Sequence, residues 1–231
     1  MPRHRREVSR VEGFSDAVFA FGITLLVVSL EVPKTYHELI AAMRAFPTFA
    51  VCFALLFQVW RRHYQFFRAY DLEDDTVIAL TGVLLFVVLF YVYPLKFLWS
   101  LPFARIEGRR ITDQIITTAQ VPALFTIYGA GVTSVFTILA LLYRHAYRMR
   151  DQLGLTGEEV LATRIQIYSN VSLAGWGVVS ITLAQVLGRV APNQVGIAGL
   201  IYTGIGVSEW IIGSYHGRRL RELNTTRTSP A

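Results

Sequence analysis

Four ionisable side chains lie in or beside long apolar segments of this 231-residue chain, namely Asp16, Glu31, His63 and Glu209. A charged group inside a membrane-spanning helix is costly, so such groups often bind an ion, relay a proton or join two helices. Proton transfer between Asp16 and His63 is therefore one candidate chemistry. No segment carries metal ligands four residues apart or a nucleophile with a base beside it, so we expect neither a metal site nor an enzyme.

The partners of Asp16 follow from helix geometry. Arg10 and Asp16 are six residues apart, which leaves their side chains about 240° out of phase on one helix. Each therefore needs a partner from another helix. Trp60 and His63, at the end of the second apolar segment, are three residues apart and share a helix face. We expect this imidazole and indole N–H to satisfy Asp16 while Phe14 packs against Trp60.

Six apolar segments must position these side chains. Hydrophobic residues make up 53% of the chain and charged residues only 16%, where a soluble domain carries about a quarter. We therefore expect an all-α integral membrane protein, with one domain over residues 1–231: a cytoplasmic N-terminus (1–13), a transmembrane bundle (14–213) and a basic cytoplasmic tail (214–231). The segments are Phe14–Val32, Phe46–Trp60, Val77–Trp99, Val121–Tyr143, Ile165–Leu187 and Val195–Gly213.

Other polar and small residues favour structural interpretations. The acidic run from Asp71 to Asp75 precedes the third segment, where carboxylates stabilise a helix N-terminus, so we expect a cap rather than a cation site. Small and hydroxyl residues in the fourth and fifth segments favour close packing of helices in lipid. These residues are Thr126, Thr133, Ser134, Thr137, Ser169, Ser172, Gly175, Gly177, Ser180 and Thr182.

The basic residues indicate topology. The net charge is +6, which by itself is compatible with nucleic-acid binding. However, six spans place the N-terminus, the loop between the second and third spans, the loop between the fourth and fifth spans and the C-terminal tail on one side of the membrane. These four segments hold 15 of the 22 Lys and Arg. The positive-inside rule then places both termini in the cytoplasm of a multi-pass protein, which we expect in a bacterial plasma membrane. Nucleic acid is not an expected partner.

The combination Arg-x-x-x-Phe-Ser-Asp at the start of the first helix and Trp-x-x-His at the end of the second resembles the transmembrane protein 175 family of potassium channels. The resemblance extends in layout to the whole chain. With one six-helix unit per chain, the protein resembles the prokaryotic branch of this family, which implies a homotetrameric assembly. It implies a hydrogen-bond network at the inner face that holds the pore helix. The residues of this network are Arg10, Phe14, Ser15, Asp16, Trp60 and His63.

The resemblance also implies a pore lined by the first helix of each subunit. One stripe of that helix contains Ala17, Phe21, Thr24, Leu25 and Val28 at 100° per residue. Every side of the helix is apolar, so periodicity alone does not separate a pore face from a lipid face. The family usually has isoleucine at the position of Phe21, where its narrowest hydrophobic ring lies. The phenylalanine here is the main departure from the pattern.

These patterns favour a potassium-preferring cation channel with hydrophobic constrictions, because the chain contains no carbonyl filter of the Thr-Val-Gly-Tyr-Gly type. We expect potassium ions, membrane lipid and other copies of the chain as partners, and no cofactor. Two alternatives stay open at this point. A proton- or cation-coupled secondary transporter would use Asp16, His63 or Glu209, although the sequence shows no internal repeat. A non-conducting membrane scaffold is compatible with Phe21.

Overall fold

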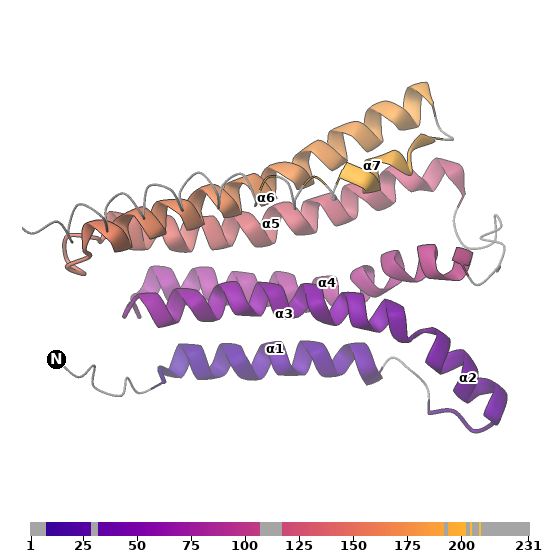
Figure 1. The fold of residues 1–231 in the computed structure, drawn as a ribbon, viewed down its shortest axis with the longest axis horizontal. Coiled ribbons are helices and arrows are strands. Elements are labelled where there is room, and N and C mark those ends of the chain that lie inside the picture. The colour runs from indigo at the N-terminus through magenta and orange to yellow at the C-terminus, as the bar shows by residue number, and fades with distance from the viewer. Residues whose placement is uncertain are drawn as a thin grey trace, which may run out of the picture. The chain divides into compact units, whose positions relative to one another are not determined.

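The computed structural model describes residues 8–28, 32–106, 117–191 and 194–201, with residues 204 and 208. All regular structure in these residues is helical, and the chain divides into two compact units, residues 1–115 and 116–231 (Figure 1). The first unit holds α1 (Arg10–Val28), α2 (Tyr36–Arg44), α3 (Phe46–Ala69) and α4 (Asp75–Ile106). The second holds η1 (Thr118–Gln120), α5 (Val121–Arg148), α6 (Gly157–Val190) and α7 (Ile197–Leu200).

In the first unit, α1 packs against α3 and α4, and these two also pack against each other. Side-chain caps fix where two of the helices begin. The Ser9 hydroxyl accepts a hydrogen bond of 3.1 Å from the Glu12 N–H at the start of α1. Asp74 Oδ1 accepts one of 2.9 Å from the Val77 N–H at the start of α4, which confirms the predicted acidic cap.

Helices α2 and α3 meet at Ala45, two residues before Pro47, with a bend of 42°. Proline is tolerated in the first turn of a helix, where its missing N–H needs no partner. Helix α3 continues to Ala69, nine residues past the apolar segment predicted to end at Trp60. Helix α4 likewise runs through Pro94 to Ile106.

In the second unit, α5 and α6 form a closely packed hairpin. Thr156 and Glu159 make a reciprocal capping box at the start of α6. Gly129 and Gly177 face each other across the pair: a Cβ on Gly129 would lie 2.8 Å from the Gly177 carbonyl oxygen. The Thr133 hydroxyl donates to the Ala174 carbonyl at 3.3 Å beside this contact, as the interpretation of small residues as packing residues predicts.

Within the described ranges, three helices are long and apolar enough to cross a membrane, or four if the bent pair α2 and α3 is one span. The three are α4, α5 and α6. The sixth predicted span, Val195–Gly213, lies largely outside the described residues. The count of six spans and the position of the termini therefore stay predictions.

Candidate functional site

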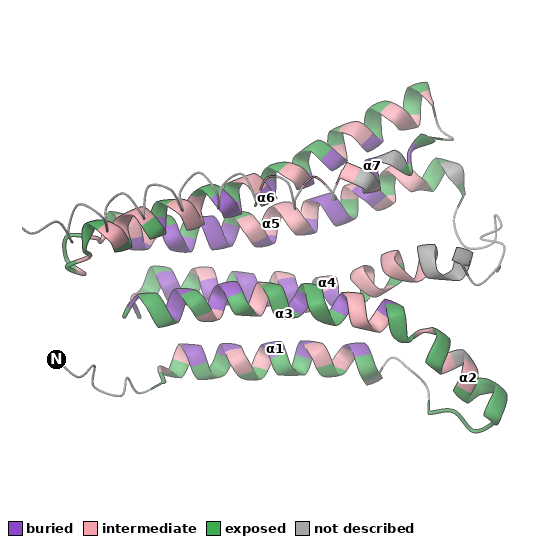
Figure 2. Cartoon of the chain, viewed as in Figure 1, coloured by how far each residue is buried: buried purple, intermediate pink, exposed green. Residues whose placement is uncertain are grey.

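Helix α1 has two distinct faces. Ser15, Phe19 and Leu26 are almost completely buried, and Glu12 is buried one turn before them. Gly22 continues this stripe, with an added Cβ placed 3.6 Å from Leu89 on α4. The spacing of three and four residues is that of a single helix face. This face attaches α1 to the rest of the first unit, as the burial colours in Figure 2 show.

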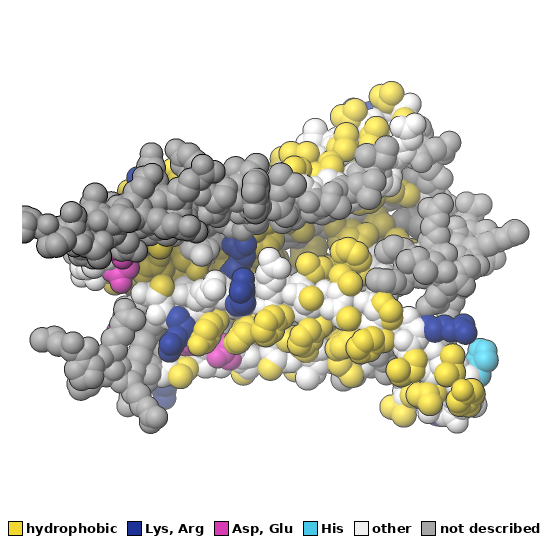
Figure 3. All heavy atoms as spheres, in the orientation of Figure 1, with side chains coloured by type: hydrophobic (Ala, Val, Ile, Leu, Met, Phe, Trp, Pro, Cys, Tyr) yellow, Lys and Arg dark blue, Asp and Glu magenta, His cyan; other side chains and the backbone are white. Residues whose placement is uncertain are grey.

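The predicted pore stripe lies on the opposite face. Ala17 and Thr24 are exposed, Phe21 is 56% exposed, and Leu25 is partly buried. The Thr24 hydroxyl donates a hydrogen bond of 2.7 Å to the Phe21 carbonyl, so its proton is held by its own helix and its oxygen remains a potential acceptor. The side chain of Val28 lies outside the described residues. Hydrophobic side chains gather over the region of α1 and α3 in the space-filling view (Figure 3).

The structure brings Asp16 and Trp60 together. The indole Nε1–H of Trp60, on α3, donates to Asp16 Oδ1 at 2.8 Å, and this pair is partly buried. A hydrogen bond to a carboxylate is among the stronger kinds in proteins. Ser15 is fully buried one residue earlier, and its hydroxyl donates to the Val11 carbonyl of its own helix at 2.7 Å. Asp16 thus has a hydrogen-bond partner on another helix, as expected for a residue that cannot pair with Arg10 on its own helix.

The other predicted members of the network do not join this contact in the described part of the chain. His63 is only 1% exposed and lies between aromatic rings, with ring centroids 5.7 Å from Phe19 and 4.9 Å from Phe67. Its Nε2 has no hydrogen-bond partner among the described residues. Phe14, which we expected to pack against Trp60, is 64% exposed on α1. Arg10 is exposed on the first turn of α1.

Sequence reasoning missed a continuous row of aromatic rings along α3. We call it the aromatic ladder; its members are Phe46, Phe49, Phe53, Phe57, Trp60 and Tyr64. Neighbouring centroids lie between 5.2 and 6.2 Å apart, within the range of favourable ring contacts. The Arg68 guanidinium lies 5.9 Å from the Tyr64 centroid at the end of the row. The spacing of three or four residues between these aromatic residues could have predicted that they share one face of α3. Within the ladder, the indole of Trp60 lies between the rings of Phe57 and Tyr64.

Two further candidates cannot be placed. Glu31 and Glu209 both lie outside the described residues. Among the residues that the structure describes, no group of three or more His, Cys, Asp or Glu side chains is arranged to hold a metal ion. The site therefore consists of two features. One is the hydrogen bond between Trp60 and Asp16, which joins α3 to α1, and the other is the exposed apolar stripe on α1.

Comparison with known proteins identifies the family. The family model described as the endosomal/lysosomal potassium channel TMEM175 matches residues 10–91, which include the whole Asp16 and Trp60 region. A protein named potassium channel from Marivirga tractuosa is 38% identical over 225 residues, covering 93% of this chain and 91% of that protein. This chain belongs to the TMEM175 family.

Solved structures of TMEM175 proteins have the same fold. A crystal structure of a variant of the potassium channel MtTMEM175, in complex with a nanobody–MBP fusion protein, matches with a TM-score of 0.80 and 33% identity. It covers 94% of this chain and 96% of that chain. A TMEM175 homologue from Chamaesiphon minutus, described as a lysosomal potassium-selective channel homologue, matches with a TM-score of 0.59, covering 91% and 98%. At 20% identity, this second likeness shows the fold alone.

Proposed function

We propose that this TMEM175 family member is a homotetrameric, potassium-preferring cation channel in the bacterial cell membrane, with α1 of each subunit lining the pore. The observation that carries the proposal is the division of α1 into two faces. One face is buried on α3 and α4, while Ala17, Phe21 and Thr24 point away from both. A closed ring of four copies is a natural way to enclose such a stripe.

In this arrangement, Phe21 forms the narrowest ring of the pore. Hydrophobic constrictions gate by excluding water, and four phenylalanine rings present a larger apolar surface than four isoleucines. The Thr24 oxygens lie about one turn further along the helix and offer acceptors to a partly dehydrated cation. Selectivity in this channel then arises without cofactors, from pore width and a few oxygen atoms.

The hydrogen bond between Trp60 and Asp16 serves to hold the pore helix. It fixes the rotation of α1 relative to α3, and rotation decides which residues face the pore. His63 contributes by packing against Phe19 on the buried face of α1, since their ring centroids lie 5.7 Å apart. A proton path through Asp16 and His63 gains no support from these contacts, so the channel proposal is preferred to the coupled-transporter alternative.

Reconstitution in liposomes tests the proposal directly. Potassium and sodium fluxes are measured for the wild type, Phe21→Ala and Phe21→Ile, with Phe86→Ala as a matched control, since Phe86 is an exposed aromatic residue on α4. We expect flux that favours potassium, changes in both Phe21 variants and is unaltered in Phe86→Ala. Flux only in Phe21→Ala means that Phe21 holds the pore shut. Silence in every folded, assembled variant, or saturable flux coupled to a proton gradient, overturns the channel proposal.

A further inference from the structure

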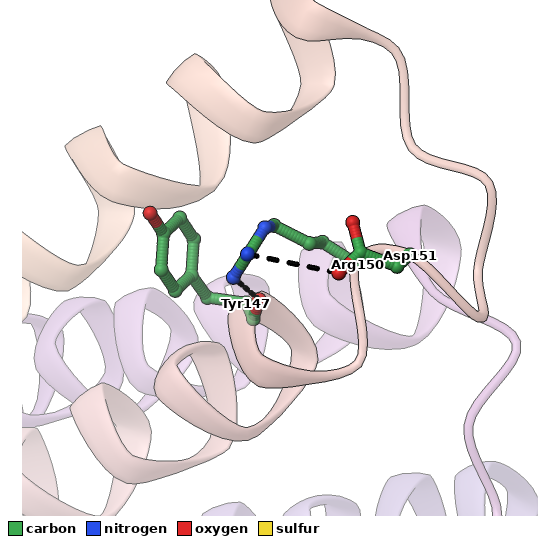
Figure 4. A network of polar contacts seen from close by, with 3 residues as sticks. All are labelled: Tyr147, Arg150 and Asp151. Atoms are coloured by element: carbon green, nitrogen blue, oxygen red, sulfur yellow. Dashed lines mark hydrogen bonds and ion pairs between the residues drawn. The ribbon is translucent and has the colours of Figure 1, made fainter.

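A second feature, unrelated to α1, lies at the turn between α5 and α6. Two guanidinium groups approach the ring of Tyr147: that of Arg150 lies 5.0 Å from its centroid and that of Arg164 lies 6.0 Å from it. Arg150 comes from the turn and Arg164 from the second turn of α6, so the fold converges them on one ring (Figure 4 shows the Arg150 side of the cluster).

The carboxylate of Asp151 offsets the positive charge of this cluster only weakly. Arg150 Nη2 lies 3.6 Å from Asp151 Oδ2, but the two side chains are 39% and 83% exposed, so water screens the pair. Arg150 Nη1 also donates to the Tyr147 carbonyl at 3.3 Å, at the negative end of the α5 dipole. Arg164 is exposed, and the contact recorded for it within the described residues is with the Tyr147 ring. The N–H donors of the Arg164 guanidinium are therefore available to bind a ligand.

The position of the cluster along α5 and α6 is the one expected at the level of lipid headgroups. Helix α5 has 28 residues and is about 42 Å long, longer than the roughly 30 Å hydrocarbon core. Its apolar part ends at Tyr143, one turn before Tyr147, and the apolar part of α6 begins directly after Arg164. Tyrosine is enriched at this boundary, where its ring contacts acyl chains and its hydroxyl contacts water.

We propose that Tyr147, Arg150 and Arg164 bind the phosphate of an anionic phospholipid headgroup in the leaflet around this end of α5 and α6. Guanidinium groups bind phosphate through paired N–H donors, and two of them beside one ring supply more donors than a single surface arginine. The exposed Arg144 and Arg148 on the last turns of α5 add positive charge to the same region. The occupant is a lipid because the site lies at headgroup depth. This inference does not depend on ion conduction.

The test uses the full chain in mild detergent and measures the shift of the thermal unfolding midpoint with added phosphatidylglycerol or phosphatidylcholine. A ligand that binds only the native state stabilises it by RT ln(1 + [L]/Kd), so the midpoint rises as the ligand concentration increases relative to Kd. We expect a shift with phosphatidylglycerol that phosphatidylcholine does not produce. Each basic residue at an anionic membrane surface changes affinity about fivefold. The Arg150→Gln/Arg164→Gln variant should therefore bind phosphatidylglycerol about thirtyfold more weakly.

The matched control is Arg189→Gln, because Arg189 is also exposed on α6 but lies at its opposite end. It should keep the full lipid response. Arg164→Gln alone is the complementary variant: it removes an exposed guanidinium whose recorded contact is with the Tyr147 ring, so it should weaken the response about fivefold, which keeps the test decisive if the double variant fails to fold.

Three results would overturn the proposal. The first is an equal response to both lipids in the wild type. The second is a response that Arg189→Gln reduces as much as Arg150→Gln/Arg164→Gln does, or one that Arg164→Gln leaves unchanged. The third is an equal shift with soluble glycerol 3-phosphate, because that would indicate a free phosphate site rather than a lipid site.

Discussion

Asp16 and Trp60, 44 residues apart in the sequence, share a hydrogen bond of 2.8 Å that connects α1 to α3. The aromatic ladder holds the indole from both sides, with ring centroids at 5.2 Å from Phe57 and 5.3 Å from Tyr64. The Asp16 carboxylate on α1 is thus held by a donor that has little freedom to move away.

Removing this donor should destabilise the protein. Trp60→Phe keeps an aromatic ring but leaves the Asp16 carboxylate without its indole N–H, a loss of about 1–3 kcal/mol. We expect a lower thermal unfolding midpoint in detergent, and a smaller effect of Trp60→Phe in an Asp16→Asn background. Trp99→Phe is the control, because Trp99 lies on α4 and has no part in this bond. Equal losses in Trp60→Phe and Trp99→Phe would contradict the assignment.

His63 should respond differently from Trp60. Its Nε2 is buried without a recorded partner, so His63→Leu removes a polar atom that costs free energy in the fold. We expect the stability to fall by less than about 1 kcal/mol or to rise, since leucine is apolar and similar in size to histidine. The measurement is the unfolding midpoint beside that of Trp60→Phe. A loss as large as that of Trp60→Phe would show that the imidazole takes part in the hydrogen-bond network after all.

The glycine contact between α5 and α6 offers a matched pair of substitutions on one helix. In Gly177→Ala the new Cβ would lie 2.7 Å from the Gly129 carbonyl oxygen, a backbone atom that cannot move aside alone. Such overpacking costs about 1–3 kcal/mol. In Gly175→Ala the new Cβ meets nothing within 4 Å, so helix propensity should give a gain of up to about 1 kcal/mol. Thermal unfolding of both variants tests the contact; equal midpoints would refute it.

Cysteine accessibility can test the two faces of α1. The natural Cys52 is fully buried, and Cys52→Ala provides the background. Thr24→Cys should react with a charged, water-soluble thiol reagent in liposomes and lose flux, because water reaches a pore but not a lipid-facing surface. Phe19→Cys, on the buried face, should stay unmodified. Reaction at Phe19→Cys with protection at Thr24→Cys would reverse the assignment of the faces.

Part of this architecture could be predicted from the sequence because it depends on strong local rules. Apolar runs locate α4, α5 and α6, and acidic residues before an apolar run locate the cap at Asp74. Helix ends were less predictable: α6 begins at Gly157, eight residues before its apolar part, because backbone hydrogen bonds continue after hydrophobicity stops.

The environment of His63 was not predictable for a different reason. An imidazole is both polar and aromatic, and residue type alone does not decide whether it finds a hydrogen bond or a ring. Here Phe67 lies one turn further along α3, while Phe19 comes from α1, so the contact with Phe19 depends on how α1 lies against α3. Asp16 was predictable, since a carboxylate has only the polar alternative.

The separation of buried and exposed residues on α1 has an evolutionary consequence. Substitutions at Phe19 or Leu26 alter the packing that keeps the helix in place, whereas a change at Phe21 leaves every recorded contact of the buried face intact. If α1 lines the pore as proposed, natural variation at the exposed positions adjusts permeation without a penalty in folding. In the proposed channel, the phenylalanine at position 21 is thus a change that the packing of α1 permits.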